Sequence, residues 1–162
     1  MKLTEAHIIA IGAVALLVGS VMTFKTRLIN KLAAFIPSVE GFSSKPYWDV
    51  SRYSWGYGTK APGSTGTISR EQAFAEMLTY LLSDYDVLKR YITRNLTVNQ
   101  WTALLSFAYN LGNDDARDLA PLINSGDDTA LGVEWKRYIH AGGVVNQTLV
   151  ARRNKEWALW VS

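Results

Sequence analysis

The sequence predicts an α+β domain that is mainly helical, with a small antiparallel sheet in its N-terminal part and an apolar helix at the N-terminus. Three observations indicate this class. After residue 69, apolar residues recur at the spacing of amphipathic helices. Residues 45–66 instead alternate Pro, Gly and aromatic residues over short distances, which is typical of short strands. Residues 8–24 carry no charge, which sets them apart as a separate segment.

The composition fits one domain with an appendage, in 162 residues of which 48% are hydrophobic. The chain has no cysteine, so neither a disulfide framework nor thiol exchange is available to it. Its net charge of +3 is modest and its basic residues are scattered, so we expect no nucleic-acid partner. The two histidines, His7 and His140, show no metal-ligand spacing, so we expect no metal and no cofactor.

Residues 8–24, IIAIGAVALLVGSVMTF, would just span a thin bilayer as a helix that rises roughly 1.5 Å per residue. The strongly apolar members contribute roughly −3 to −5 kcal/mol to insertion, and the glycines and polar residues weaken this. A cleaved signal peptide, a permanent anchor and a buried core helix are three open interpretations. No good cleavage site follows Phe24, and a permanent anchor is normally longer or more apolar.

The remaining chain is expected to be helical outside the small sheet. Pro37 can end or bend the first of these helices, which puts Glu40 near a helix end. A break near Ser83–Asp84 is possible in the second. We expect a loop at 113–126 that contains one short helix around 119–123. Five helices are predicted, at about residues 25–39, 70–94, 97–111, 127–140 and 148–160.

Two capping boxes support the starts of the second and third helices. Ser69 with Gln72 and Thr97 with Gln100 each pair a hydroxyl residue with a Gln three positions later. Gly112 then ends the third helix.

The residues best suited to chemistry lie in the stretch 40–59, EGFSSKPYWDVSRYSWGYGT. Glu40 and Asp49 are followed by a hydroxyl residue, Ser54 or Thr59, and such a set suits acid–base work on a neutral polymer. Glycosidases keep one carboxyl protonated to donate to the leaving oxygen, and one ionised to orient water or stabilise positive charge. The spacing alone is a weak signal, because a Glu and an Asp this close are common on solvated surfaces.

The same stretch resembles the active-site segment of the phage lysozymes, the muramidase family of the T-even and lambdoid phages. The matching residues are Glu40–Gly41, Tyr47, Asp49 and the glycine-spaced strand at 56–58. The family usually places one more residue between its Asp and a Thr than the four that separate Asp49 from Ser54 here. Ser54 keeps the hydroxyl, and Thr59 is a second candidate for that role.

Two later segments resemble the same family. The segment 109–112, Tyr-Asn-Leu-Gly, is similar to its aromatic-Asn-x-Gly motif, and this implies that Asn110 forms a hydrogen bond near Glu40 or the sugar. Residues 135–156 resemble its C-terminal motif, in which Arg152, or alternatively Arg153, holds the Glu and tunes its pKa. The alternatives are a plain helix end and an exposed basic helix face.

Aromatic residues are candidates for sugar contacts, because aromatic faces pack on pyranose rings. Tyr57, on the glycine-flanked strand, is the best candidate, and Trp48 is a weaker one. Most such residues in a small domain belong to the core, which is the competing interpretation for both.

The resemblance implies a two-lobed lysozyme-like fold at residues 31–162, after a segment at 1–30 that enters and later leaves the membrane, as in signal-anchor-release endolysins. It implies hydrolysis of the β-1,4 bond between N-acetylmuramic acid and N-acetylglucosamine in peptidoglycan, with host cell lysis. Glu40 would be the general acid, Asp49 would orient water or stabilise charge, and Ser54 would help to hold that water. The expected form is a monomer, first at the host inner membrane and then in the periplasm.

The charges that flank the apolar run favour the opposite orientation. Lys25, Arg27 and Lys31 follow the run, and the positive-inside rule would keep that side in the cytoplasm. We nevertheless expect the domain that follows the run to lie outside the inner membrane, because peptidoglycan lies there.

Two other classes of protein stay open. The departure at Ser54 is compatible with a wall-binding protein that has lost catalysis, and the apolar run is compatible with a membrane-anchored protein of a virion or envelope. Within the enzymes, a transglycosylase would use Glu40 alone, and the presence of Asp49 argues against it.

Overall fold

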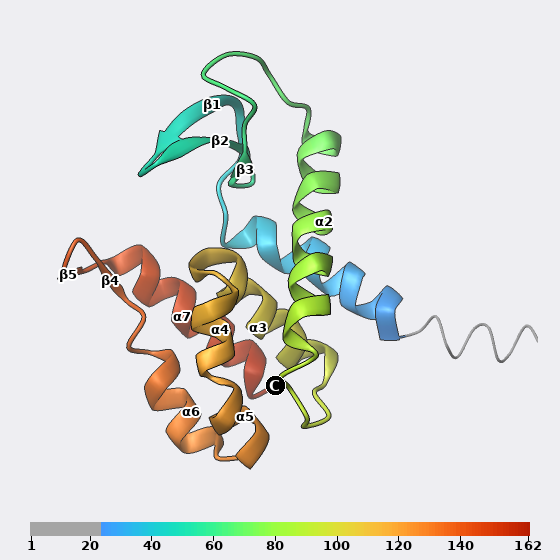
Figure 1. Ribbon diagram of the computed structural model, residues 1–162, viewed down its shortest axis with the longest axis vertical. Coiled ribbons are helices and arrows are strands. Elements are labelled where there is room, and N and C mark those ends of the chain that lie inside the picture. Colours follow the sequence, from blue (N-terminus) through green and yellow to red (C-terminus); the bar gives the residue numbers. More distant parts are fainter. Residues whose placement is uncertain (1–23) are drawn as a thin grey trace, which may run out of the picture.

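The computed structural model describes residues 24–162, which form two lobes joined by a long helix (Figure 1). The predicted apolar run therefore lies outside the described residues except for Phe24. No helix within 24–162 is long and apolar enough to cross a membrane.

The N-terminal part begins with a helix at residues 24–35, followed by the short 3-10 helix η1 (Ile36–Ser38). The apolar spacing seen in the sequence places Leu28, Leu32 and Ile36 in the core, all essentially fully buried. The expected domain boundary at residue 31 thus falls inside a helix, and the folded body already includes Leu28.

A three-stranded antiparallel sheet follows, in the order β1 (Ser43–Asp49), β2 (Arg52–Gly56) and β3 (Thr59–Lys60). In the hairpin of β1 and β2, Tyr47 pairs with Ser54 and Asp49 pairs with Arg52. Directly paired residues point to the same side of a sheet, so these four side chains share one face.

The long helix is α2 (Arg70–Leu88), and it starts at the capping box of Ser69 and Gln72 as predicted. It passes the suggested break without interruption and ends six residues before the predicted end near Arg94. The sheet packs tightly on α2 at Gly56, whose φ is +58° and whose missing Cβ would lie 2.7 Å from the Cβ of Ala73.

The C-terminal lobe is built around α3 (Val98–Leu111), which starts at the second predicted capping box and is buried from Trp101 to Ala108. The last helix is α7 (Gln147–Trp160), capped by the side chain of Asn146. The other helices of this lobe are α4 (Asn113–Asp118), α5 (Ala120–Ser125) and α6 (Asp128–Trp135).

Two predictions for this lobe need correction. The short helix expected around 119–123 is confirmed as α5, but the rest of the expected loop at 113–126 contains a second helix, α4, because the apolar residues of the stretch, spaced as in a helix, are buried at Ala116, Leu119 and Ile123. The helix expected to reach His140 ends at Trp135. Residues 140–145 instead form a hairpin of β4 (His140–Ala141) and β5 (Val144–Val145) around two glycines with positive φ.

Candidate active site

Glu40 stands where the first helical segment gives way to the sheet. Its backbone N–H donates to the carbonyl of Ile36 at 2.9 Å, which closes the turn after Pro37. Because Ile36 is anchored in the core, the backbone of Glu40 is held against the body while its side chain stays 20% exposed.

Arg152, from α7, contacts this carboxyl directly. Its Nη1 lies 2.5 Å from Oε1 of Glu40, and the Arg152 side chain is 5% exposed. Two further bonds fix the guanidinium: Nη2 donates to the carbonyl of Ser106 at 3.0 Å, and Nε donates to Oε1 of Glu156 at 3.0 Å. The arginine preferred in the sequence analysis is therefore the one that meets Glu40.

Glu156 is the centre of a buried cluster that the sequence analysis did not recognise as such. Its carboxylate is fully buried and accepts hydrogen bonds from Ser106 Oγ at 2.7 Å and Trp135 Nε1 at 3.2 Å. It also pairs with the buried Arg153, whose Nη2 lies 3.1 Å from Oε1. The spacing of Arg152 and Glu156, four positions apart on one helix, was the available signal.

Asn110 binds this cluster. Its Oδ1 accepts a hydrogen bond from Arg153 Nη2 at 2.9 Å. The resemblance implied a hydrogen bond near Glu40 or the sugar, and the bond in the structure holds the second arginine. Asn110 thereby supports the cluster that fixes Arg152.

The surroundings raise the pKa of Glu40 above its ordinary value. Burial is the main cause, because it disfavours the charged form. The charge and hydrogen bond of Arg152 act in the opposite direction, and the negative charges of Glu156 and Asp49 add to the increase. Burial also lowers the pKa of Arg153 to about 10. Glu40 is thus a carboxyl that retains its proton to higher pH than an exposed one.

Asp49 ends β1 on the sheet face that it shares with Ser54. The fully buried Ser54 hydroxyl donates to Oδ2 of Asp49 at a long 3.4 Å. Thr59, the other candidate, donates instead to Oε2 of Glu76 on α2 at 2.7 Å. Of the two hydroxyls, it is that of Ser54 that contacts Asp49.

The shorter connection in this chain is closed by a tight hairpin turn. Only Val50 and Ser51 separate the paired residues Asp49 and Arg52, and Val50 has a φ of +53°, an uncommon conformation for a β-branched residue. This turn sets the register that pairs Ser54 with Tyr47.

Tyr57 does not offer its ring to a substrate, which corrects the sequence-based prediction. It is 8% exposed, packs against Phe42 at 5.4 Å between ring centroids, and accepts a hydrogen bond from Tyr109 at its carbonyl. Trp48 is exposed, but it alternates with Asp49 and so points to the other face of β1, against Tyr53.

The aromatic residue on the site's own face is Tyr47, which the sequence analysis matched to a motif without giving it a role. Its exposed side chain shares a sheet face with Asp49, and its pKa is raised by burial and by the charges of Asp49 and Glu40. Its position two residues before Asp49 on a strand was the signal available in the sequence.

A cavity of about 130 Å³ lies beside these residues, between the sheet and the helices α2 and α3. Gly58 lines this cavity and also lies next to Glu40, since a Cβ at Gly58 would lie 3.9 Å from Oε2 of Glu40. Tyr109 lines the cavity as well, and burial together with the charge of Glu40 raises its pKa. The cavity is lined by Arg52, Gly58, Thr59, Lys60, Tyr80, Asp84, Ala108 and Tyr109.

The arrangement offers a proton donor and a second carboxylate to one polar substrate. The raised pKa of Glu40 suits it to donate a proton, Arg152 can stabilise the carboxylate left after donation, and Asp49 with Ser54 can orient a water molecule. Among residues 24–162, no group of three or more His, Cys, Asp or Glu side chains is placed to hold a metal ion.

The family pattern and the relatives that match this chain indicate the same family. The phage lysozyme family pattern matches residues 37–156. The chain is 33% identical over 134 residues to the endolysin of Bacillus phage PZA, covering 78% of this chain and 52% of that relative. It is 29% identical to the endolysin of Bacillus phage B103 over 134 residues, covering 78% of this chain and 51% of that relative. The chain thus spans about half the length of the curated relatives it matches.

Solved structures agree with this fold. The muramidase domain of SpmX from Asticaccaulis excentricus has a TM-score of 0.74 and 25% identity, covering 81% of this chain and 95% of that one. The endolysin from Escherichia coli O157:H7 phage FAHEc1 has a TM-score of 0.72 and 24% identity, covering 82% and 91%. The described residues therefore adopt a lysozyme-like fold, mainly helical with a small antiparallel sheet.

The raised pKa of Glu40 predicts a pH-dependent cost in stability. The folded state holds this proton more tightly than the unfolded state, so the free energy of unfolding falls as pH rises from the unfolded pKa through the folded one. Glu40→Gln removes this titration. Relative to the wild type, the variant should gain stability across that window and keep the gain at neutral pH, as measured by urea unfolding over a pH series.

Glu71→Gln is the matched control, because the pKa of Glu71 is lowered by hydrogen bonds with its own backbone and with Ser69. A lowered pKa gives stability that is present above the unfolded pKa and lost at acid pH, so this variant should lose relative stability at neutral pH. A change of the same sign in both variants would contradict the assignment.

Proposed function

Because the chain belongs to the phage lysozyme family, we propose that it hydrolyses the β-1,4 bond between N-acetylmuramic acid and N-acetylglucosamine in peptidoglycan and so lyses the host cell. The observation that carries this proposal is the carboxyl of Glu40, partly buried, raised in pKa and held by Arg152. The endolysin relatives and the muramidase neighbour support the same class of reaction.

In this proposal Glu40 is the general acid. Its raised pKa keeps the proton available, and it donates this proton to the glycosidic oxygen as the bond to the sugar breaks. The carboxylate that remains is stabilised by the Nη1 of Arg152, which needs no rearrangement because the contact already exists. Burial therefore favours the stored proton, and the pairing with Arg152 favours its release.

Asp49 is the residue that acts on water or on the developing positive charge. The hydroxyl of Ser54 donates to one oxygen of Asp49, which leaves the other oxygen free to accept from a water molecule. The contact supports Ser54 as the third residue of the site, and it weakens the case for a wall-binding protein that has lost catalysis.

We also propose that the segment at 1–30 inserts in the inner membrane through its uncharged run at 8–24 and is later released, so that the protein passes from the membrane to the periplasm. The uncharged run at 8–24 supports insertion, and its glycines and polar residues support release. The run leads directly into the helix at 24–35, which buries Leu28 and Leu32 and ends four residues, 36–39, before Glu40. A chain held in the membrane keeps Glu40 close to the bilayer, so we expect it to be inactive.

Glu40→Gln should reduce the release of reducing sugar ends from purified peptidoglycan by about 100-fold or more, since a positioned general acid contributes about 10²- to 10⁴-fold. Glu71→Gln, an exposed change of the same chemistry on α2, should keep full activity. Retention of more than about a tenth of the activity by Glu40→Gln would remove Glu40 from the mechanism. Mass spectrometry of the products separates hydrolysis from a transglycosylase, which leaves a 1,6-anhydro sugar.

Ser54→Ala and Thr59→Ala should separate catalysis from stability. Ser54→Ala loses the hydroxyl on Asp49, so activity should fall about 10-fold or more at a temperature where the variant is folded. Thr59→Ala loses the bond to Glu76, so it should lower the free energy of unfolding by about 1–3 kcal/mol with a smaller loss of activity. The reverse ranking in activity would transfer the third role to Thr59.

Replacing Gly12 and Gly19 by Leu should trap the chain in the membrane, because two strong apolar residues are added to a weak segment. Cells that produce this variant should lyse late or not at all after membrane depolarisation, and fractionation should find the protein in the membrane. Ser at the same two positions is the control and should still be released. Lysis on the normal schedule with Leu, or a mature protein that lacks residues 1–24 through cleavage, would contradict controlled release.

A further inference from the structure

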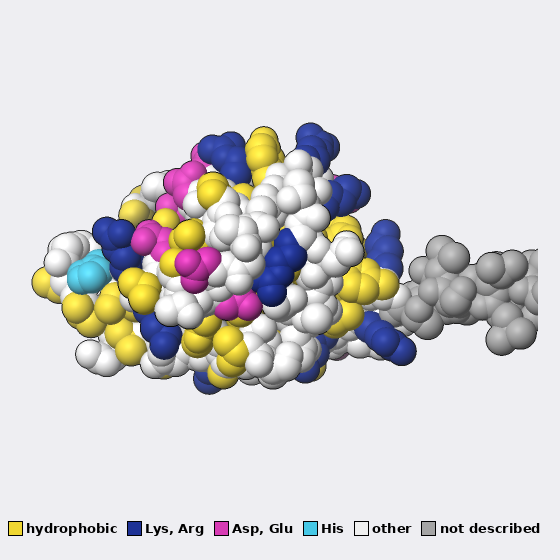
Figure 2. All heavy atoms as spheres, turned by 90° about the horizontal axis from the view of Figure 1, so that it is seen from below, with side chains coloured by type: hydrophobic (Ala, Val, Ile, Leu, Met, Phe, Trp, Pro, Cys, Tyr) yellow, Lys and Arg dark blue, Asp and Glu magenta, His cyan; other side chains and the backbone are white. Residues whose placement is uncertain are grey.

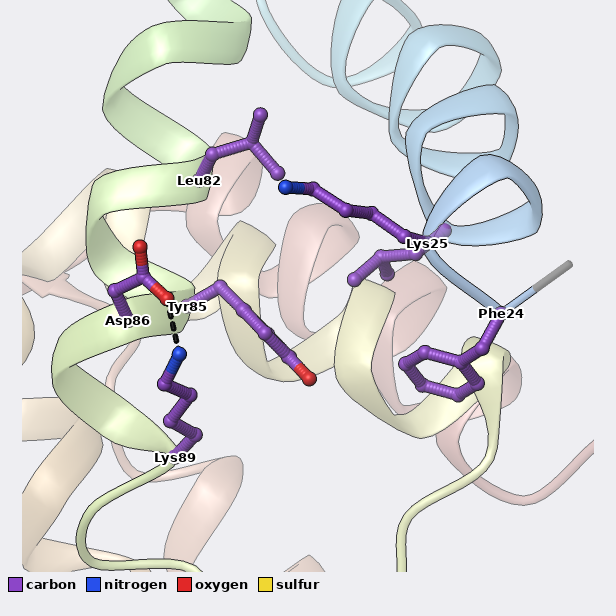
Figure 3. A pocket seen from close by; sticks show the side chains of 7 residues that line it. Phe24, Lys25, Leu82, Tyr85, Asp86 and Lys89 are labelled. Atoms are coloured by element: carbon purple, nitrogen blue, oxygen red, sulfur yellow. Dashed lines mark hydrogen bonds and ion pairs between the residues drawn. The ribbon is translucent and has the colours of Figure 1, made fainter. Parts of the chain in front are cut away.

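A pocket of about 210 Å³ lies between the helix at 24–35 and the C-terminal half of α2, away from the candidate active site (Figure 3). Its apolar lining comes from Phe24, Leu28, Leu82 and Tyr85. Leu28 is buried in the core, so the floor of the pocket is firm, while Phe24 is exposed at its edge. The function proposed above makes no use of this pocket.

Charged side chains stand at the pocket's rim. Lys25 extends toward α2, and Lys89 contacts Asp86 (Figure 3). Lys25, Asp86 and Lys89 line the pocket, so two cations stand beside a single carboxylate. Lys89 is half exposed, and Asp86 is more exposed still. The rim therefore carries an excess of positive charge that is accessible from outside.

The pocket lies directly after the uncharged run at 8–24 in the chain, and this position determines which ligands can reach it. Phe24 is both the last residue of the uncharged run at 8–24 and a residue of the pocket, and Lys25 follows it directly. Consecutive Cα atoms are only about 3.8 Å apart, so a run held in the bilayer keeps the pocket at the level of the lipid headgroups. Figure 2 shows several Lys and Arg side chains at the end of the molecule where the described residues begin.

We propose that this pocket binds the headgroup of an anionic phospholipid. The phosphate would lie against Lys25 and Lys89, and the glycerol and the first methylenes of the acyl chains against Leu28 and Leu82. The inference rests on the membrane attachment proposed above for the position of the pocket, and it is independent of the hydrolytic reaction. An anionic lipid matches the positive rim, whereas a zwitterionic lipid adds no net charge.

Lipid binding at this place would regulate release. A lipid in the pocket holds the start of the helix at 24–35 on the membrane surface, and the same stretch leads to Glu40. Anionic lipid thus adds to the weak attachment of the apolar run and prolongs the time before release. Basic residues near an anionic surface each strengthen binding about fivefold, and salt screens this effect.

The test measures partition of the full chain into vesicles of phosphatidylcholine alone and of phosphatidylcholine with phosphatidylglycerol. The wild type should bind the second kind more tightly, and salt should reduce the difference. The double variant Lys25→Gln with Lys89→Gln should reduce the gain in vesicle affinity that phosphatidylglycerol gives by about 25-fold, at about fivefold for each lysine. Its affinity for neutral vesicles should stay unchanged.

Lys136→Gln with Arg137→Gln is the matched control. It also removes two exposed cations, one of them paired three positions away with Glu134 as Lys89 is with Asp86. These residues follow α6, on the opposite side of the molecule from the helix at 24–35 (Figure 1). The control variant should keep the gain from phosphatidylglycerol.

The outcomes separate this inference from the proposed attachment. A wild type that binds neutral vesicles but gains nothing from phosphatidylglycerol overturns the lipid pocket and leaves the attachment standing. A wild type that binds only the anionic vesicles, through Lys25 and Lys89, supports the pocket and contradicts attachment by the apolar run. Equal losses in the double variant and its control overturn the pocket, because net charge then explains the binding.

The same variants would also reveal whether the chain's own N-terminal residues, and not a lipid, occupy the pocket. If residues from 1–23 filled the pocket, the double variant would lower the free energy of unfolding in lipid-free buffer and keep its gain from phosphatidylglycerol. That pair of results overturns the lipid proposal.

Discussion

Arg152 and Glu40 come from opposite ends of the described chain, 112 positions apart, and meet in a largely buried hydrogen bond from the guanidinium to the carboxyl. A buried guanidinium is tolerable only when its charge and its donors are satisfied. Glu156 and the carbonyl of Ser106 supply those partners, so α7 and α3 must pack closely before Glu40 can be held. Two arginines, Arg152 and Arg153, face the single negative charge of Glu156 while Glu40 is protonated. The cluster then carries one excess positive charge, and loss of the proton from Glu40 neutralises it, which favours release of the proton.

The residues 24–40 connect two regions with different chemistry. At one end Phe24 and Lys25 line the basic-rimmed pocket, and at the other end Glu40 meets the buried cluster from α7. Between them, Leu28 and Ile36 anchor the segment in the core. A helix is stiff along its axis, so a force applied at Phe24 is carried toward Glu40 more directly than through a flexible loop. The proposed membrane attachment and the proposed proton donation thus share one structural element.

The features that sequence reasoning missed all depend on neighbours far along the chain. The short helix α4 has weak local signals and is stabilised by burying Ala116 in the body. Tyr57 looked available because it lies between glycines, but the approach of Tyr109 and Phe42 buries it. Asn110 was expected to form a hydrogen bond near Glu40 or the sugar, and its contact with Arg153, a buried arginine from α7, was not foreseen.

Signals that act within a few residues were readable directly. The two capping boxes depend only on a side chain and a backbone N–H three positions away, so both helix starts followed from the sequence. The candidate pair of Glu40 and Asp49 was also visible, because both lie on one short segment around a hairpin. The choice between Ser54 and Thr59 was not local: the pairing of β1 with β2 brings Ser54 to Asp49, and Glu76, from α2, takes the hydroxyl of Thr59. A strand's register and a helix's approach are settled by packing of the whole domain, which spacing along the chain does not encode.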